Sequence, residues 1–138
     1  AQVRWPARLE WAGQVLLDGG HNPQCAAALR ECTEHYFPDC ERVALAGVLR
    51  DKDYRRIVKT LAPLFSLVVC VTPDSERALP AEELAGLFAA AGCETETAGS
   101  IEDGVELAQD KAREKGAMVC AFGSLYICGD IRACFGLR

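Results

Sequence analysis

The chain lacks a hydrophobic run long enough to cross a membrane. Its longest uncharged apolar stretches, residues 65–71 and 118–122, have the length of a strand, whereas a membrane-spanning helix needs roughly 18 such residues. Residues 1–11 also lack the charged and then apolar pattern of a signal peptide. We therefore expect a cytoplasmic location and no membrane partner.

An excess of basic residues is missing as well. Lys and Arg number 15 against 20 Asp and Glu, and the formal net charge is −5. A nucleic-acid surface needs a clustered excess of Lys and Arg to neutralise phosphates, so we expect no nucleic-acid partner. Small local anion sites are compatible with this charge. The length of 138 residues and the hydrophobic share of 50% are typical of one globular domain.

The cysteines include no Cys-x-x-Cys pair, the spacing that zinc sites commonly use. They stand at positions 25, 32, 40, 70, 93, 120, 128 and 134, mostly inside apolar runs. A chain of this length can bury a core without disulfides. We expect reduced cysteines that pack in the core, and no metal ligands. A thiol-based redox or metal protein is the alternative.

Three motifs of nucleotide-binding proteins and hydrolases are absent: G-x-x-x-x-G-K-[ST], G-x-G-x-x-G after a strand, and G-x-S-x-G. The chain therefore cannot hold a nucleoside triphosphate in the P-loop manner. Neither histidine fits a recognisable Ser/His/Asp order, and His35 is expected to be structural within a helix. These absences indicate that the polar residues present form only one half of an active site.

Segments typical of strands and helices alternate along the chain. The expected strands are residues 14–17, 43–48, 66–72 and 118–122, with an edge strand at 93–97; the expected helices are 23–37, 54–65, 81–91, 101–115 and 124–135. Ser100 is a candidate N-cap of the fourth helix, and Gly116 would end it. Strict alternation predicts an α/β fold, a three-layer sandwich with a mostly parallel, Rossmann-like sheet of five or six strands and helices on both faces.

Ligands of such folds bind beyond the carboxyl ends of the strands. The first strand ends in Asp18-Gly19-Gly20-His21-Asn22-Pro23, where the glycines permit a tight turn and Asn-Pro is typical of a helix start. Asp18 and His21 would then stand beside a helix N-terminus, which favours anions. A tight turn with incidental polar residues is the alternative.

Three further strand ends carry polar residues. Residues 50–53, Arg-Asp-Lys-Asp, are either part of a site or a solvated turn with Asp53 as a helix cap. The loop at 72–80 carries Arg77, which could pair with phosphate or carboxylate or be an ordinary surface residue. Gly123-Ser124 offers backbone N–H groups and a hydroxyl, or else a simple helix cap.

The chain resembles the C-terminal domain of folylpolyglutamate synthase/dihydrofolate synthase, in the Mur ligase superfamily. Four motifs in the family's order carry the resemblance: Asp18-Gly19-Gly20-His21-Asn22-Pro23, Asp51-Lys52-Asp53, Arg77-Ala78-Leu79-Pro80 and Gly123-Ser124-Leu125-Tyr126. Pro6-Ala7-Arg8 resembles the family's Pro-Gly-Arg segment, which implies a hinge remnant at 1–12 and the domain at 13–138. Gly20 stands where the family usually has Ala, and Ala7 where it usually has Gly.

The resemblance implies an ATP-dependent ligase that adds L-glutamate to the γ-carboxylate of a folate, to dihydropteroate, or to both. ATP would phosphorylate the carboxylate, and the glutamate amine would attack the acyl phosphate, with Mg²⁺ and basic groups neutralising charge. The P-loop and most metal ligands would lie in a larger N-terminal domain of the same protein, absent from this sequence and its expected partner. The chain alone is expected to be an inactive fragment.

The resemblance also assigns roles to individual residues. Arg8 and Asp18 would contact the adenosine part of ATP, and Asp18 is suited to accept hydrogen bonds from ribose hydroxyls. His21 and Ser124 would be catalytic, holding the incoming glutamate or the transferring group where the domains close. No metal ligand is assigned to this chain.

Lys52 and Arg77 are further candidates for contacts with ATP or another anion. One alternative function is a free-standing nucleotide- or anion-binding module without catalysis. Another is the C-terminal domain of a cell-wall Mur ligase, although the Gly-Ser-Leu-Tyr and Asp-Lys-Asp motifs favour the folate branch.

Overall fold

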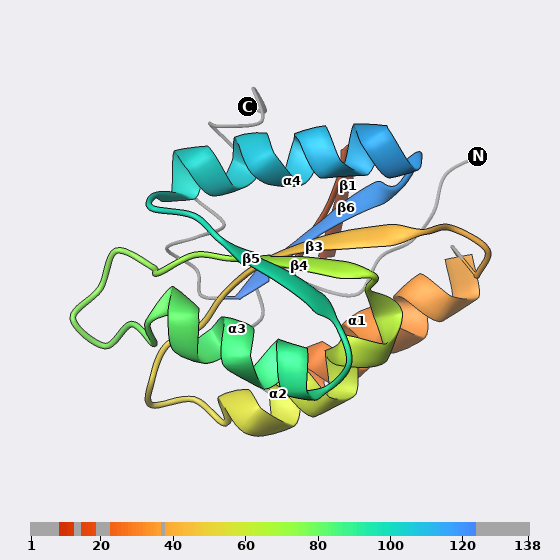
Figure 1. Cartoon of the computed structure of the whole chain (residues 1–138). Coiled ribbons are helices and arrows are strands. Elements are labelled where there is room, and N and C mark those ends of the chain that lie inside the picture. The colour runs from red at the N-terminus through yellow and green to blue at the C-terminus, as the bar shows by residue number, and fades with distance from the viewer. Residues whose placement is uncertain (1–8, 13–14, 19–22, 37, 124–138) are drawn as a thin grey trace.

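The computed structural model describes residues 9–12, 15–18, 23–36 and 38–123 (Figure 1). Its strands are β1 (Leu9–Ala12), β2 (Val15–Asp18), β3 (Arg42–Gly47), β4 (Leu67–Cys70), β5 (Glu94–Thr97) and β6 (Met118–Gly123). Its helices are α1 (Pro23–Tyr36), α2 (Tyr54–Leu61), α3 (Ala81–Ala90) and α4 (Ile101–Lys115), with a short 3-10 helix η1 (Ala62–Leu64).

The described strands form one sheet in the order β1-β2-β6-β3-β4-β5. Every neighbouring pair from β2 to β5 is parallel, and β1 pairs antiparallel with β2. The predicted α/β fold with a mostly parallel sheet is confirmed. The prediction of strict alternation is wrong near the N-terminus, because only residues 13–14 separate β1 from β2. Antiparallel neighbours need no more than a short connection, whereas parallel ones need a crossover.

Two helix predictions differ from the structure or lie outside it. The helix predicted at 54–65 is α2, ending at Leu61, followed by η1. Pro63 explains the change, because proline has no N–H for a helical hydrogen bond and tightens the last turn. The helix predicted at 124–135 lies outside the described residues. β1 falls within the predicted hinge remnant at 1–12, and the domain boundary itself stays a prediction.

Helices cover both faces of the sheet, and the side chains that pack between helix and sheet differ from one face to the other. Figure 1 shows α1, α2 and α3 on one side of the sheet and α4 on the other. On the three-helix side, the ring of Phe122 stacks on Phe65 at 5.8 Å between centroids and meets Phe88 edge-on at 6.4 Å. On the other side, small residues of α4 such as Ala108 pack against the β-branched strand residues, for example Val43. Alternate residues along each strand supply the two faces.

The ends of α4 follow the sequence prediction. The Ser100 hydroxyl accepts a hydrogen bond from the Asp103 N–H at 3.0 Å, and Gly116 ends the helix in the left-handed conformation, with φ of 64°. Near its start, Gly104 lies so close to the sheet that an added Cβ would stand 2.4 Å from Val71 Cγ1. Among the described residues, no helix has both the length and the apolar character needed to cross a membrane.

Candidate functional site

The carboxyl ends of the parallel strands meet at one edge of the sheet. A single row of paired residues crosses it there, in the order Asp18, Phe122, Ala46, Cys70 and Thr97. Asp18, a predicted site residue, is thus the last residue of β2 at this edge. Because neighbouring strands lie about 4.8 Å apart, β2 stands about 10 Å from β3, whose loop carries Lys52.

Two glycines face each other where β3 and β6 end at this edge. Gly47 and Gly123 are register partners at the ends of the two strands. Gly123 has a φ of 134°, and a Cβ added to it would lie 1.7 Å from the carbonyl oxygen of Gly47. Only glycine fits there, since any side chain would both clash and strain the backbone. The glycine at position 123 is therefore required by its contact with the Gly47 backbone.

The loops that follow β3 and β4 are joined by backbone hydrogen bonds. The Leu79 N–H donates to the Val48 carbonyl at 3.0 Å, and the Arg50 N–H donates to the Arg77 carbonyl. Leu49 and Ala78 form an antiparallel bridge between these bonds. Residues 48–50 and 77–79 consequently behave as a short two-stranded ribbon, which we call the loop ribbon.

A side-chain ion pair lies beside the loop ribbon. Arg77 Nη1 stands 2.8 Å from Asp51 Oδ2, and the side chains are 56% and 47% exposed. The Arg77 N–H also donates to the Ser75 hydroxyl at 3.1 Å. The backbone N–H, the backbone carbonyl and the guanidinium of Arg77 are therefore all bonded within these two loops.

The start of α3 is capped from the same loop. Pro80 occupies the N-cap position and offers no side-chain acceptor, and the Ala81 N–H donates instead to the Thr72 hydroxyl at 2.9 Å. Thr72 comes just after β4, so this one bond closes the loop of residues 72–81. The loop is held at its base by Thr72 and at its far side by the loop ribbon.

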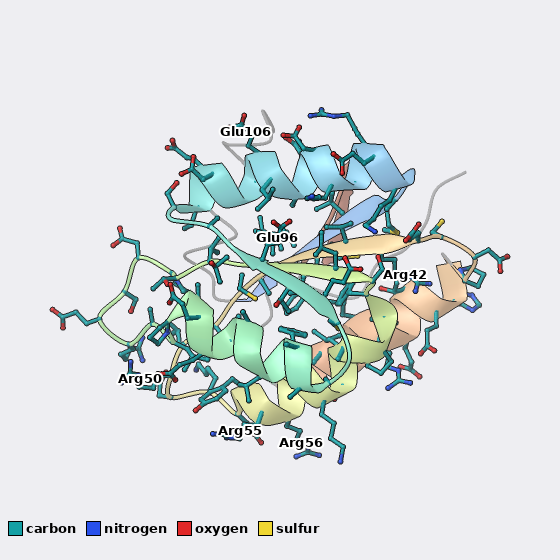
Figure 2. The ribbon with its side chains drawn as sticks, viewed as in Figure 1. Arg42, Arg50, Arg55, Arg56, Glu96 and Glu106 are labelled. Carbon is teal, nitrogen blue, oxygen red and sulfur yellow. The ribbon has the colours of Figure 1, made fainter. Side chains whose placement is uncertain are left out.

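Two cations at this edge make no ion pair with any described residue. Lys52 is half-buried and follows Asp51 directly, and Arg50 is exposed. Figure 2 shows Arg50 near the loops at the carboxyl edge and Arg42, at the start of β3, on the opposite side of the molecule. Cations without partners can attract an anion, while Arg77 is already neutralised locally by Asp51.

The structure brings some of the predicted site residues together. Asp18 ends β2, and Lys52 and Arg77 lie in the loops that follow β3 and β4, so all three stand at the carboxyl edge of the sheet. Arg8, His21 and Ser124 lie outside the described residues, so their placement stays a prediction. Asp53 stands at the N-cap position of α2, but its side chain makes no capping hydrogen bond.

Asp51 and Thr72 have no role of their own among the sequence predictions, although Asp51 belongs to the Asp51-Lys52-Asp53 motif. Asp51 stands in the charged run 50–53, but nothing in the sequence tells which charge pairs across the fold. Thr72 comes one residue before Pro73 and eight before Pro80, and this spacing suggests a loop but not the hydrogen-bond partner.

The described cysteines give no support to thiol or metal chemistry. Cys40, Cys70, Cys93 and Cys120 form no disulfide bonds, and Cys70 and Cys120 are buried in the core. Burial, with a smaller effect from Cys93, raises the pKa of Cys70 to about 12, so the group stays a thiol at neutral pH. Within the part of the chain that the structure describes, no three His, Cys, Asp or Glu side chains gather as a metal site.

Two shallow grooves lie away from the carboxyl edge. One, of about 430 Å³, lies between β5 and the end of α4, beside Glu94 and Lys115. The other, of about 400 Å³, lies between α2 and α3, beside Lys59 and Ala91. Neither groove is lined by a residue of the loop ribbon or by the last residue of a strand.

Comparisons with known proteins assign the chain to a family. Residues 7–125 match the model of the Mur ligase, glutamate ligase domain. A dihydrofolate synthase/folylpolyglutamate synthase of Mycobacterium tuberculosis is 34% identical over 99% of this chain and 31% of its own length. A probable bifunctional folylpolyglutamate synthase/dihydropteroate synthase of Haloferax volcanii is 32% identical over 94% of this chain and 16% of its own.

A solved structure agrees with these relatives. Mycobacterium tuberculosis folylpolyglutamate synthase, complexed with ADP and AMPPCP, superposes with a TM-score of 0.87 at 31% identity, over 99% of this chain and 33% of that one. The chain thus spans about a third of the length of the Mycobacterium relative, and the resemblance stated from the motifs is confirmed. The chain belongs to the Mur ligase glutamate ligase domain family, as the C-terminal domain found in folylpolyglutamate synthase/dihydrofolate synthases.

Proposed function

We propose that this chain is the ATP- and glutamate-contacting domain of a ligase that adds L-glutamate to a folate, to dihydropteroate, or to both. The observation that carries the proposal is the shared carboxyl edge. There Asp18, the Gly47–Gly123 contact and the loop of Lys52 come together in a chain of this family. The names of the relatives support the folate substrate over a cell-wall precursor.

The proposal assigns the adenosine part of ATP to Arg8 and Asp18. A carboxylate at the end of β2 can accept hydrogen bonds from the two ribose hydroxyls. Acidic residues at strand ends commonly bind ribose in this way in nucleotide-binding folds. His21 and Ser124 hold the incoming glutamate or the transferring group. Lys52 supplies a cation that attracts the glutamate carboxylate or a phosphate, since its charge is not neutralised by any described residue.

The reaction places demands that this chain meets only in part. Phosphoryl transfer needs alignment of the reacting atoms and neutralisation of charge by Mg²⁺ and basic groups. The described residues hold no cluster of acids that fits a metal ion. In line with the family resemblance, the proposal assigns most of the Mg²⁺ ligands to a P-loop domain of the same protein, and closure of the two domains completes the site.

The first experiment measures release of ADP by the full-length ligase that contains this chain. We expect ADP only when ATP, Mg²⁺, L-glutamate and either tetrahydrofolate or dihydropteroate are all present. The isolated chain should show no Mg²⁺-dependent hydrolysis of ATP. Tight ATP binding by the isolated chain in calorimetry, without glutamate-dependent turnover by the full-length protein, would favour the free-standing binding module instead.

A variant tests the role of Asp18 within the same assay. Asp18→Asn should raise the KM for ATP about tenfold, because hydrogen bonds to a charged group contribute about 1.5–3 kcal/mol and each 1.4 kcal/mol is a factor of ten. The KM for glutamate should change little. Glu106→Gln is the matched control, an equal loss of charge on the exposed side of α4 (Figure 2). An unchanged KM for ATP in Asp18→Asn would remove Asp18 from the adenosine site.

A further inference from the structure

The ion pair between Asp51 and Arg77 is expected to contribute little to the free energy of unfolding. Both side chains are about half exposed, and exposed ion pairs contribute about 0–1 kcal/mol. The loop ribbon beside it is already held by backbone hydrogen bonds from Arg50 and Leu79. Any role of the pair therefore comes from the segment that it fixes in place and not from its contribution to the stability of the fold.

What the pair holds is the base of Lys52. Asp51 stands between the loop ribbon, which ends at Arg50, and Lys52. The Lys52 N–H donates to the Leu49 carbonyl at 3.2 Å, and its carbonyl accepts from the Tyr54 N–H at 2.8 Å. The Asp51 carboxylate, bonded to a residue 26 positions away, adds a side-chain link between this turn and the loop after β4 to the backbone bonds of the loop ribbon.

Arg77 is suited to be the fixed end of this link. Its N–H donates to the Ser75 hydroxyl and its carbonyl accepts from the Arg50 N–H, so its backbone is held on both sides. Its charge is neutralised by Asp51 at 2.8 Å. Lys52 and Arg50 are both without an ion pair among the described residues, and Lys52, which is half-buried where Arg50 is exposed, is the more confined of these two cations.

We propose that Asp51 and Arg77 are positioning residues that hold the Lys52 ammonium group in place for the anionic substrate. This inference rests on the proposed function and replaces the direct anion contact that the sequence predicts for Arg77. The substrate group is a carboxylate or a phosphate, the anions that the proposed ligation brings to this edge. Arg77 keeps further guanidinium N–H groups that could bind an anion directly, so the experiment must separate the two roles.

The experiment uses the full-length ligase and four variants: Asp51→Asn, Arg77→Gln, their combination, and the exchange D51R/R77D. If the pair positions Lys52, Asp51→Asn and Arg77→Gln each lower kcat/KM for glutamate about tenfold, and the combination is no worse than either alone. The exchange variant D51R/R77D regains at least half of the kcat/KM that the single variants lose. If Arg77 itself binds the anion, Asp51→Asn leaves kcat/KM unchanged and the exchange stays as low as Arg77→Gln, which overturns the proposal.

A cycle with Lys52 separates positioning from a general effect on folding. In a Lys52→Met background, Asp51→Asn should cost less than twofold, because the group that it positions is gone. A further tenfold loss there would show an effect that bypasses Lys52 and would overturn the proposal. The paired control is Lys111→Met with Glu96→Gln, which removes an exposed ion pair between α4 and β5 and should leave kcat/KM unchanged.

The outcomes separate this inference from the proposed function. A full-length wild-type protein that releases no ADP with glutamate and either acceptor would overturn the proposed function and this inference with it. An active wild type with an unaffected Asp51→Asn variant would overturn the inference alone. Hydrogen exchange checks the link without activity: Asp51→Asn should speed exchange at the Lys52 and Arg77 amides and leave the amides of α4 unchanged.

Discussion

The two edges of the sheet are built differently, although the same parallel strands end at both. At the amino edge, the chain enters β5 and β6 through tight turns closed by bonds to the preceding helix, such as Cys93 N–H to Phe88 and Ala117 N–H to Ala112. At the carboxyl edge, β3 and β4 run into longer loops that bond to each other. Bonds between distant segments occur at both edges, since at the amino edge the Ser66 hydroxyl donates to the Arg42 carbonyl at 3.2 Å. The carboxyl edge differs in that two long loops pair with each other there as the loop ribbon.

The difference concerns the edge at which we propose the site. Local turns bring together neighbours in sequence, whereas the loop ribbon brings Arg50 and Asp51 beside Arg77. Ligands in open α/β sheets bind at the carboxyl ends of the strands. The predictions below test whether changes at the carboxyl edge affect both folding and ligation, while matched changes elsewhere affect folding alone.

The largest effect is expected from Gly123→Ala. The new Cβ would overlap the Gly47 carbonyl at a φ that only glycine adopts readily, and overpacking with backbone strain costs about 3 kcal/mol or more. Gly116→Ala, at the amino edge, also meets a left-handed φ but open space, so about 1 kcal/mol is expected. Urea unfolding of the two variants measures both. Equal losses would mean that the close approach of β3 and β6 does not matter.

A smaller effect is expected from Thr72→Val, which keeps the shape of the side chain and removes its hydroxyl. The Ala81 N–H then loses its acceptor, and the free energy of unfolding should fall by about 1 kcal/mol, as for the loss of a helix cap. Ser100→Ala removes the cap of α4 and should cost a similar amount. Only Thr72→Val should also lower ligase activity, because its bond closes the loop of Arg77; equal activity losses would refute this difference.

The smallest effect is expected from Lys111→Met. Lys111 Nζ stands 3.7 Å from Glu96 Oε2, in a pair that is a third or more exposed on each side. Such pairs contribute about 0.2–1 kcal/mol and are screened by salt. Urea unfolding should therefore differ from the wild type by no more than about 0.5 kcal/mol, and less at high salt. A loss above 1 kcal/mol would show that the edge of β5 depends on this pair more than its exposure implies.

Much of the fold follows from local patterns in the sequence. The continuous apolar runs of β3 and β6 and the Ser100 and Gly116 boundaries of α4 were predicted within about a residue, because burial and capping leave a mark on neighbouring residues. β1 was missed because an edge strand of four residues carries too little periodicity to recognise. The apolar periodicity predicts a helix to residue 65, but Pro63 cannot donate a helical hydrogen bond and α2 ends at Leu61.

The site was predicted only as a set of strand ends. Parallel strands oblige Asp18, Lys52 and Arg77 to share an edge, and the sequence was enough to place them there. It could not show that Arg77 is paired, because its partner Asp51 is 26 residues away in a run of four charged residues. Nor could it show that Gly123 is needed for close packing, since its contact, Gly47, belongs to another strand.

By itself, the sequence determined the class of fold, the order of the motifs and the family to which they belong. Each of these depends on local patterns, namely apolar periodicity, helix caps and short polar runs at strand ends, which are formed by residues near one another in the chain. Only the tertiary structure decided which charges neutralise each other, as Asp51 does Arg77. Ion pairs and close backbone contacts are set by distance in space, and at this edge that distance exists only once β3 and β4 are side by side.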